Sequence, residues 1–313
     1  MFFKQFKAVF KNSFKVCAGD PFYLVISLTM VVVMALAASM PSIGNEHTRL
    51  VRDQTHSILF ICGALATSFG LIRVVTDDIR RGAGSILMSR PLSGTVLMTG
   101  KLCGVLACTL VLFISGGAAA VWISEINNHA EMVNKLSFTL FVLAIFASLG
   151  AGAARQYMFG TSFSKYTTGA LAFFMTLGVT VRYFAGHSED FDLKGIQSIV
   201  LLYLALAVFA SIILVIAVVA DSAMVLGFSV LVFFFGLLSE YLCSSVIGGS
   251  AGGVLASILP NWQLFWVLEK IGTGEIIPTS YFLVCGIHTL ILVFLYLNIA
   301  VIFFDRIEIK GVA

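Results

Sequence analysis

Eight long apolar runs, separated by polar segments, constrain this chain more than any other feature of its sequence. Each run is about 20 residues long, the length that an α-helix needs to cross the hydrocarbon core of a bilayer. Sustained alternation of polar and apolar residues is missing from them, so helices are favoured over a β-barrel. We therefore expect an all-α polytopic membrane protein, with about eight transmembrane helices near residues 21–40, 56–75, 101–123, 137–155, 166–184, 197–219, 223–242 and 281–303.

The scarcity of charge supports the same conclusion. Only 11% of the 313 residues are charged, against about 25% in soluble domains. A chain so poor in charge cannot cover a water-exposed surface, and it reads as one transmembrane domain over residues 1–313. The net charge is only +3, with no basic patch interleaved with aromatic residues, so nucleic acid is not an expected partner. The six cysteines form no CxxC pair, so no redox or zinc framework is predicted.

The distribution of Lys and Arg predicts the orientation in the membrane. If the N-terminus is cytoplasmic, 13 of the 19 basic residues fall on the cytoplasmic side. An even number of spans then returns the C-terminus to that side. The first apolar run is longer than the 7–15 residues of a signal-peptide core, so we expect it to be retained. The expected location is the plasma (inner) membrane, with both termini in the cytoplasm.

Residues 1–16 predict an amphipathic helix that lies in the membrane interface. Phenylalanines and lysines both recur at steps of three and four, which gives the helix an aromatic face and a basic face. The lipids of an anionic leaflet are the expected partner. A plain positive flank that orients the first span would use the same lysines. The residues that form the two faces are Phe3, Phe6, Phe10, Lys4, Lys7 and Lys11.

The polar stretch at residues 76–100 is longer than a simple loop requires. It begins with Asp77 and Asp78, and acids are favoured at a helix N-terminus. An apolar group follows at residues 86–88, and Pro91 would end the helix. The pattern predicts a short cytoplasmic surface helix that docks on a partner, with the arginines of the stretch binding carboxylates or lipid head groups. An ordinary positive-inside loop is the simpler reading.

Residues 244–280 form a second unusual region, on the extracytoplasmic side. They are rich in Gly and contain an apolar part that is too short to cross the bilayer. We expect a re-entrant or surface-lying hairpin before the last span, with its non-helical backbone protected by protein or a cavity. Its second half carries residues typical of an interfacial aromatic belt, namely Pro260, Asn261, Trp262 and Trp266.

Two segments resemble enzymatic motifs. The segment from Gly94 to Leu102 approximates a Walker A motif, but five residues separate its glycines and Leu102 stands where Ser or Thr should bind magnesium. No nucleotide site is therefore expected in this chain. A GxSxG string around Ser250 could pair with His288 as an intramembrane serine hydrolase. We favour close helix packing as the role of its glycines.

Metal and disulfide sites are weakly indicated. The five histidines lie in the outer half with a few acids, but their spacing matches no ligand motif, so solvated histidines are favoured. Cys243 and Cys285 both lie near the outer face and could pair, although small apolar filling is the favoured role. Charges inside the spans are few, which counts against an ion-coupled secondary transporter or channel, the main alternative function.

Four features together resemble the type-2 permeases of ATP-binding cassette exporters. They are the basic Phe-rich N-terminal helix, the stretch between the second and third spans, the segment Leu259–Trp266, and the basic tail FDRIEIK. In the family, the stretch tends to show an acid, a glycine, Leu-Ser-x-Pro and a Gly-Lys that opens the next span. Here the matching residues are Asp78, Gly82, Leu87, Ser89, Pro91, Gly100 and Lys101.

The resemblance implies a transport subunit without enzymatic activity. ATP and magnesium would be bound by a separate ATPase, and this chain would bind no cofactor. A second permease chain, identical or related, would complete the pathway. The family usually has six spans, so residues 137–184 would be an inserted pair. Residues 244–280 would form the outer gate. The coupling residues implied are Asp78, Arg80, Arg81, Gly82, Ile86, Leu87, Met88, Arg90 and Pro91.

Overall fold

The computed structural model describes residues 2–39, 47–80, 93–126, 134–187, 191–243, 259–273, 275 and 277–312. Helices make up nearly all of this part of the chain. The long ones are α1 (Phe2–Ala18), α2 (Pro21–Ser39), α3 (His47–Leu71), α6 (Gly94–Ile126), α7 (Lys135–Phe159), α8 (Phe163–Arg182), α9 (Gly195–Val219), α10 (Ser222–Tyr241) and α13 (Thr279–Val312). The short ones are the π-helices η1 (Ile72–Thr76) and η2 (Tyr183–His187), α4 (Asp77–Arg80), the 3₁₀ turn η5 (Gln263–Phe265) and α12 (Leu268–Gly272).

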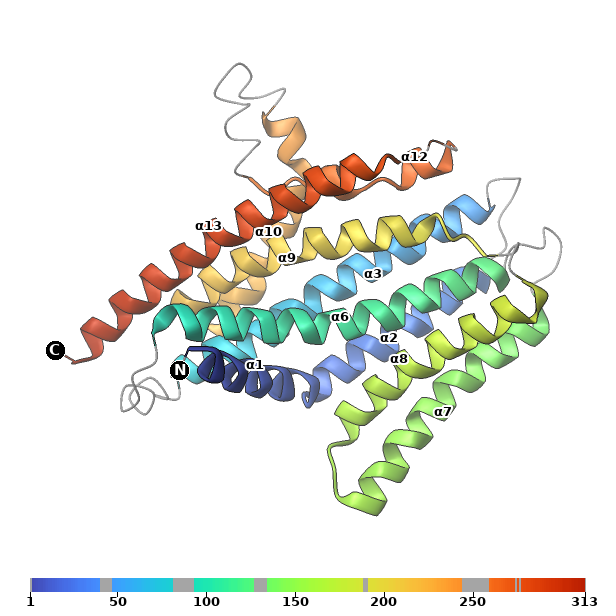
Figure 1. Cartoon of the computed structure of the whole chain (residues 1–313), viewed down its shortest axis with the longest axis horizontal. Helices are drawn as coiled ribbons and strands as arrows, with labels where there is room; N and C mark the ends of the chain where they lie inside the picture. Colours follow the sequence, from blue (N-terminus) through green and yellow to red (C-terminus); the bar gives the residue numbers. More distant parts are fainter. Residues whose placement is uncertain are drawn as a thin grey trace.

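Each predicted apolar run lies in one of the long helices, so the all-α prediction is confirmed. In the described ranges, seven helices are long and apolar enough to cross a membrane, or up to eight if α1 and α2, bent by 61°, count as one span. The chain is therefore a multi-pass membrane protein. The N-terminal α1 and the end of α13 lie at the same end of the bundle (Figure 1), which we call the α1 end.

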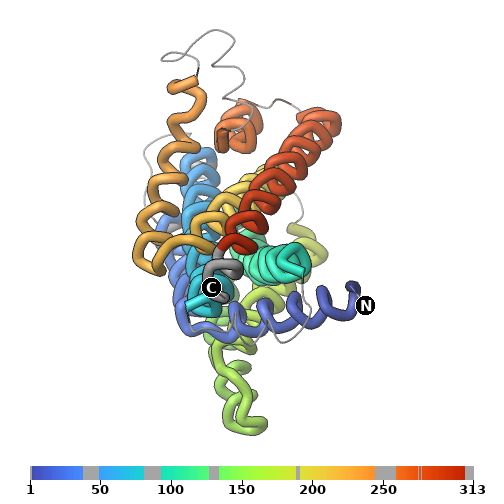
Figure 2. The backbone as a smooth tube through the Cα atoms, turned by 90° about the vertical axis from the view of Figure 1, so that its left-hand side faces the viewer, coloured from blue at the N-terminus to red at the C-terminus, as the bar shows by residue number. Residues whose placement is uncertain are grey.

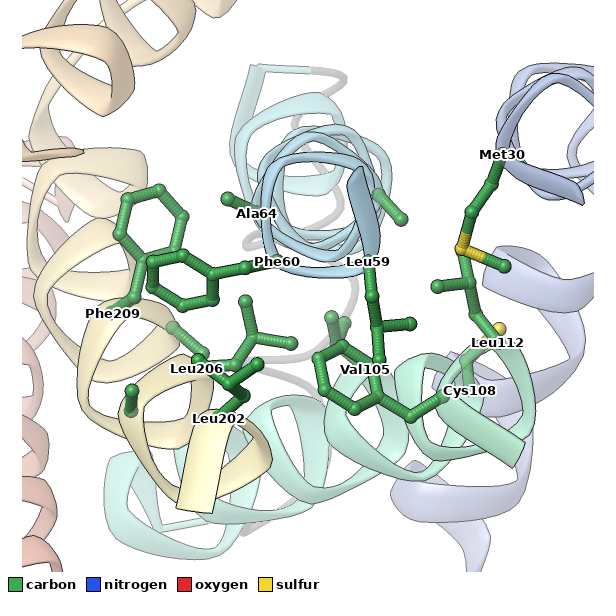
Figure 3. Packing of buried hydrophobic residues seen from close by; sticks show 14 of the residues in the cluster. Met30, Leu59, Phe60, Ala64, Val105, Cys108, Leu112, Leu202, Leu206 and Phe209 are labelled. Atoms are coloured by element: carbon green, nitrogen blue, oxygen red, sulfur yellow. The ribbon is translucent and has the colours of Figure 1, made fainter. Parts of the chain in front are cut away.

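Three helices form the centre of the bundle. In their most apolar windows, 67% of the residues around α3, 61% of those in α6 and 56% of those in α9 are buried, against 22% in both α10 and α13. Figure 3 shows the interlocking side chains of α3, α6 and α9, with Met30 joining from α2. The central helices are the most buried, and dense packing of this kind holds transmembrane helices together in lipid.

The helices α7 and α8 form a peripheral antiparallel hairpin. It stands apart on one side of the bundle in both views (Figures 1 and 2). The turn between them is set by Gly160, whose φ of 62° is left-handed and whose amide donates to the carbonyl oxygen of Gln156 at 2.9 Å. Glycine is favoured at this position because it carries no Cβ.

The second span is longer than its sequence pattern predicts. The helical run reaches from Arg49 through η1 and α4 to Arg80. We expected a polar loop before residue 56, but Arg52 lies on the helix and pairs with Asp192 at 3.1 Å. We also expected Asp77 and Asp78 at the beginning of a helix. Both lie in the first turn of α4, which continues directly from α3 and η1.

A buried ion pair fastens α8 to α6 at the end opposite α1. Glu125 is fully buried, and Arg182 donates to its carboxylate. Ser137 also donates to Glu125, and the indole nitrogen of Trp122 donates to Ser137 at 2.8 Å. Asn134 adds a longer bond at 3.3 Å and caps α7 through Ser137. We call Trp122, Glu125, Asn134, Ser137 and Arg182 the latch.

The latch yields a prediction for stability. Changing Glu125→Ala removes the partner of a buried guanidinium, and losing one member of a buried pair costs about 3–5 kcal/mol. We expect a clear fall in the midpoint of thermal unfolding in detergent. The double variant Glu125→Met with Arg182→Met removes both charges and should recover most of the loss. If Glu125→Ala alone were as stable as the parent protein, the Glu125–Arg182 pair would not stabilise the fold.

Candidate functional site

Charged side chains converge at the α1 end, around the described beginning and end of the stretch at residues 76–100. They come from the α1–α2 turn, from η1 and α4, from the beginning of α6 and from the α9–α10 turn. We call this cluster the junction, and its members are Asp20, Arg73, Asp77, Asp78, Arg80, Lys101 and Asp221.

Lys101 joins the two ends of the stretch. Its ammonium donates to the carboxylate of Asp78 at 2.9 Å and to the carbonyl oxygen of Val74 at 2.6 Å. The Lys101 side chain is only 5% exposed. Val74 belongs to the π-helix η1, and π-turns change the carbonyl pairing of an α-helix. Lys101 therefore binds both a carboxylate and a backbone oxygen, and it ties α6 to the end of the α3 run.

Arg73 ties the same region to the α1–α2 turn. Its Nε donates to Asp20 at 2.6 Å, and its Nη1 donates to Asp77 at 3.3 Å. Asp20 also accepts a hydrogen bond from the amide of Phe22 at 2.8 Å. An Asp at the N-cap followed by Pro21 is a favoured way to begin a helix. Asp20 thus sets both the beginning of α2 and the position of Arg73.

The α9–α10 turn is the third attachment. Arg80 forms an ion pair with Asp221, which is the N-cap residue of α10. The hydroxyl of Thr76 donates to the carbonyl oxygen of Ala217 at 2.9 Å. Arg80 and Asp221 are both about half exposed, so their pair alone adds little to stability. Its role is to fix position, because it connects α4 to the turn between α9 and α10.

The N-terminal helix packs against α6 beside the junction. A Cβ added at Gly104 would lie 2.6 Å from the Cβ of Ser13, and one at Gly100 would lie 2.8 Å from Val9. The predicted aromatic row is present, since Phe6 stacks on Phe10 with ring centroids 6.2 Å apart. Phe3 is exposed, and so are the lysines of the basic face, namely Lys4, Lys7 and Lys11. The amphipathic helix is therefore present from Phe2 to Ala18.

Only two of the predicted coupling residues are among the residues that the structure describes. Asp78 and Arg80 lie in the junction. The stretch returns to the described chain at Ser93, and a Cβ at Gly94 would lie 2.5 Å from the carboxylate of Asp305 on α13. The other coupling residues lie outside the described residues; they are Arg81, Gly82, Ile86, Leu87, Met88, Arg90 and Pro91.

The expected outer gate is described only in its second half. Trp262 is 2% exposed, and its indole nitrogen donates to the carbonyl oxygen of Phe233 at 2.9 Å. Its ring meets Phe60 and Phe209 from the centre of the bundle. Trp262 is therefore a packing residue. We expected it in an aromatic belt at the membrane interface, but it is buried inside the protein, because Gly236 leaves space for the indole against α10.

The other residues of that segment have mixed environments. Pro260 is buried, while Asn261 and Trp266 are half-buried. Trp262 and Trp266 line a cavity of about 650 Å³ together with Glu240 and Glu269. The first half of the expected hairpin, residues 244–258, lies outside the described residues, and Ser250 of the hydrolase alternative lies there too.

The structure also describes the cysteines and some of the histidines that the sequence raised as candidates. Cys243 and Cys285 are both free and buried, so they do not pair in this structure. No group of three potential metal ligands occurs among the described residues. His56 was expected in solvent, but it is buried and bonded to the carbonyl oxygens of Arg52 and Gly195. Sequence analysis also missed the Glu125–Arg182 pair, although an acid and a base near the same ends of two spans were a usable signal.

Neither a protein-family model, nor a curated protein, nor a solved structure matches this chain. The site must therefore be interpreted from its own geometry. It joins four helix ends by ion pairs at the base of one long polar segment.

The packing of α1 gives a testable consequence. Gly104→Leu would place a side chain inside α1, so we expect α1 to separate from α6 and the unfolding midpoint to fall by several degrees. Limited proteolysis should then cut within residues 2–18 faster than in the parent. Gly227→Leu is the matched control, because a Cβ there meets nothing within 4 Å. If the two variants had the same unfolding midpoint and the same rate of cleavage within residues 2–18, the position of α1 would not depend on its contact with Gly104.

Proposed function

We propose that this chain is the permease subunit of an ATP-binding cassette exporter and that a separate ATPase drives it through the stretch at residues 76–100. The observation that carries the proposal is the ion pair between Asp78 and Lys101. It closes the base of the stretch, so a push on the segment between them acts on two central helices together.

The junction offers a direct mechanical route. The α3 run and α6 both enter the bundle centre, and Arg73 and Arg80 extend the connection to α2 and α10. Because packed helices move as discrete units, a displacement at the junction would shift several spans together. The helix α1, wedged against Gly100 and Gly104, would follow α6. This arrangement suits a subunit that receives force from a partner.

The distribution of charge favours an external source of energy. On the α3 run, no charged residue occurs between Asp53 and Arg73, and none occurs on α6 between Lys101 and Glu125. A proton- or ion-coupled transporter usually carries ionisable residues near the bilayer midplane. The ion pairs described above lie towards the helix ends, where they join helices. ATP hydrolysis by a partner chain therefore explains transport better than ion coupling.

The proposal has further parts. The ATPase holds ATP and magnesium, and this chain is not an enzyme. A second permease chain, identical or related, completes the pathway. The protein resides in the bacterial inner membrane with the α1 end facing the cytoplasm. The segment around Trp262 and Trp266 belongs to the outer gate, and the lipids of the inner leaflet contact the basic face of α1.

Docking on the ATPase is tested at Leu87. Leu87→Asp would place a carboxylate in an apolar docking groove, which costs several kcal/mol when it is unpaired. We expect the apparent affinity of this chain for the ATPase to fall by about 100-fold, which corresponds to ~2.8 kcal/mol, so that less ATPase co-purifies. Membrane insertion and yield should be unchanged. Met158→Asp, at an exposed apolar position on the α7–α8 hairpin, is the control. Full retention of ATPase by the Leu87 variant would refute the docking role.

Coupling is tested separately at Lys101. Lys101→Met keeps the length of the side chain but removes both bonds at the base of the stretch. We expect the ATPase still to co-purify, while the permease-dependent stimulation of its hydrolysis falls by about tenfold, or ~1.4 kcal/mol. Lys15→Met, an exposed lysine on α1, is the control. Unchanged stimulation in the Lys101 variant would show that force does not pass through this ion pair.

A further inference from the structure

A groove opens between the peripheral hairpin and the bundle, near the α1 end. It has a volume of about 720 Å³, within the range of sites that hold small ligands. Its walls come from α1, α2, α6, α7 and α8. Ser164 on α8 donates to the backbone carbonyl oxygen of Asp20 at 2.8 Å, so the beginning of α8 lies against the α1–α2 turn. The groove therefore begins at the level of the junction and runs into the membrane along α8.

The groove has one charged end and one apolar end. Arg155 and Lys165 stand at the end near the α7–α8 turn, and Phe173 and Phe174 line it two turns further along α8. Eight residues separate Lys165 from Phe173, which is about 12 Å along a helix. One leaflet contributes roughly 15 Å to the hydrocarbon core. The lining thus changes from basic to apolar over most of the depth of one leaflet.

The two cations are held together without a counter-ion. The guanidinium of Arg155 lies 4.9 Å from the ring centre of Tyr166, and the ammonium of Lys165 lies 5.7 Å from the same ring. Within the described part of the chain, neither residue takes part in an ion pair, unlike Arg73, Arg80 and Lys101 at the same end of the bundle. Two like charges on one ring repel each other, so an anion between them is favoured.

We propose that an anionic phospholipid of the leaflet on the α1 side occupies this groove. Its phosphate is bound by Arg155 and Lys165, and one acyl chain lies along Phe173 and Phe174. The occupant is lipid rather than a soluble anion, because the charged end opens directly into an apolar slot at leaflet depth. The lipid would fill the space between the hairpin and α1. This site does not depend on the exporter function.

The test uses the purified full-length protein in detergent with added phosphatidylglycerol, monitored by native mass spectrometry. Both lipids carry a phosphate, but the quaternary ammonium of phosphatidylcholine brings a further positive charge towards Arg155 and Lys165. We therefore expect phosphatidylglycerol to bind at least about tenfold more tightly than phosphatidylcholine. The variant Arg155→Gln with Lys165→Gln should lose this preference. Lys135→Gln with Lys194→Gln, which removes two exposed cations at the end of the bundle opposite α1, should keep it.

A second variant tests the acyl slot independently of charge. Gly169 lines the groove, and a Cβ there meets nothing within 4 Å, so Gly169→Leu fills the slot without a clash in the fold. We expect it to weaken phosphatidylglycerol binding about tenfold or more, whereas Gly227→Leu on α10 has no effect. Unfolding midpoints of both variants should match the parent.

Three results would overturn the proposal. The first is equal binding of phosphatidylcholine and phosphatidylglycerol. The second is normal phosphatidylglycerol binding by Gly169→Leu. The third is displacement of phosphatidylglycerol by glycerol 3-phosphate at equal concentration, which would identify a soluble-phosphate site without an acyl slot.

Discussion

A charge buried between helices is costly unless a partner neutralises it, and this requirement decides how several helix ends of the protein meet. At the α1 end, Lys101 is almost completely buried and is satisfied by Asp78 and by the carbonyl oxygen of Val74. At the opposite end, Glu125 is fully buried and is satisfied by Arg182 and Ser137. Both clusters involve α6, so this central helix is fixed at each end by polar contacts and along its length by apolar packing.

The two fixed ends have different mechanical characters. The latch holds the α7–α8 hairpin against α6 through buried groups, and such a contact is rigid because breaking it leaves an unpaired charge in the protein interior. The junction has more members and is more exposed, as the half-exposed pair of Arg80 and Asp221 illustrates. It also includes a π-helix, a conformation that is often found at functional sites. The junction is therefore the better place for a movement to begin, and the latch is the better place for an anchor.

The hairpin and the bundle are connected differently at their two ends. The latch joins them opposite α1 through buried charged groups. Near α1, the hydroxyl of Ser164 donates to the α1–α2 turn, and a groove with two unpaired cations lies beside this contact. The hairpin stands to one side of the bundle (Figure 2). A lipid in the groove would add to the contact that Ser164 makes with the α1–α2 turn.

The helices themselves were predictable from sequence, since runs of about 20 apolar residues can satisfy their backbone only as helices in lipid. The amphipathic pattern of Phe and Lys likewise determined α1. Sequence alone could not decide which distant charges pair. Asp78 and Lys101 are 23 residues apart, Glu125 and Arg182 are 57 apart, and Arg52 and Asp192 are 140 apart. Those pairs, the buried place of Trp262 and the groove beside α1 depend on how the helices pack, because the energy of a charge or an indole is set by its neighbours in space.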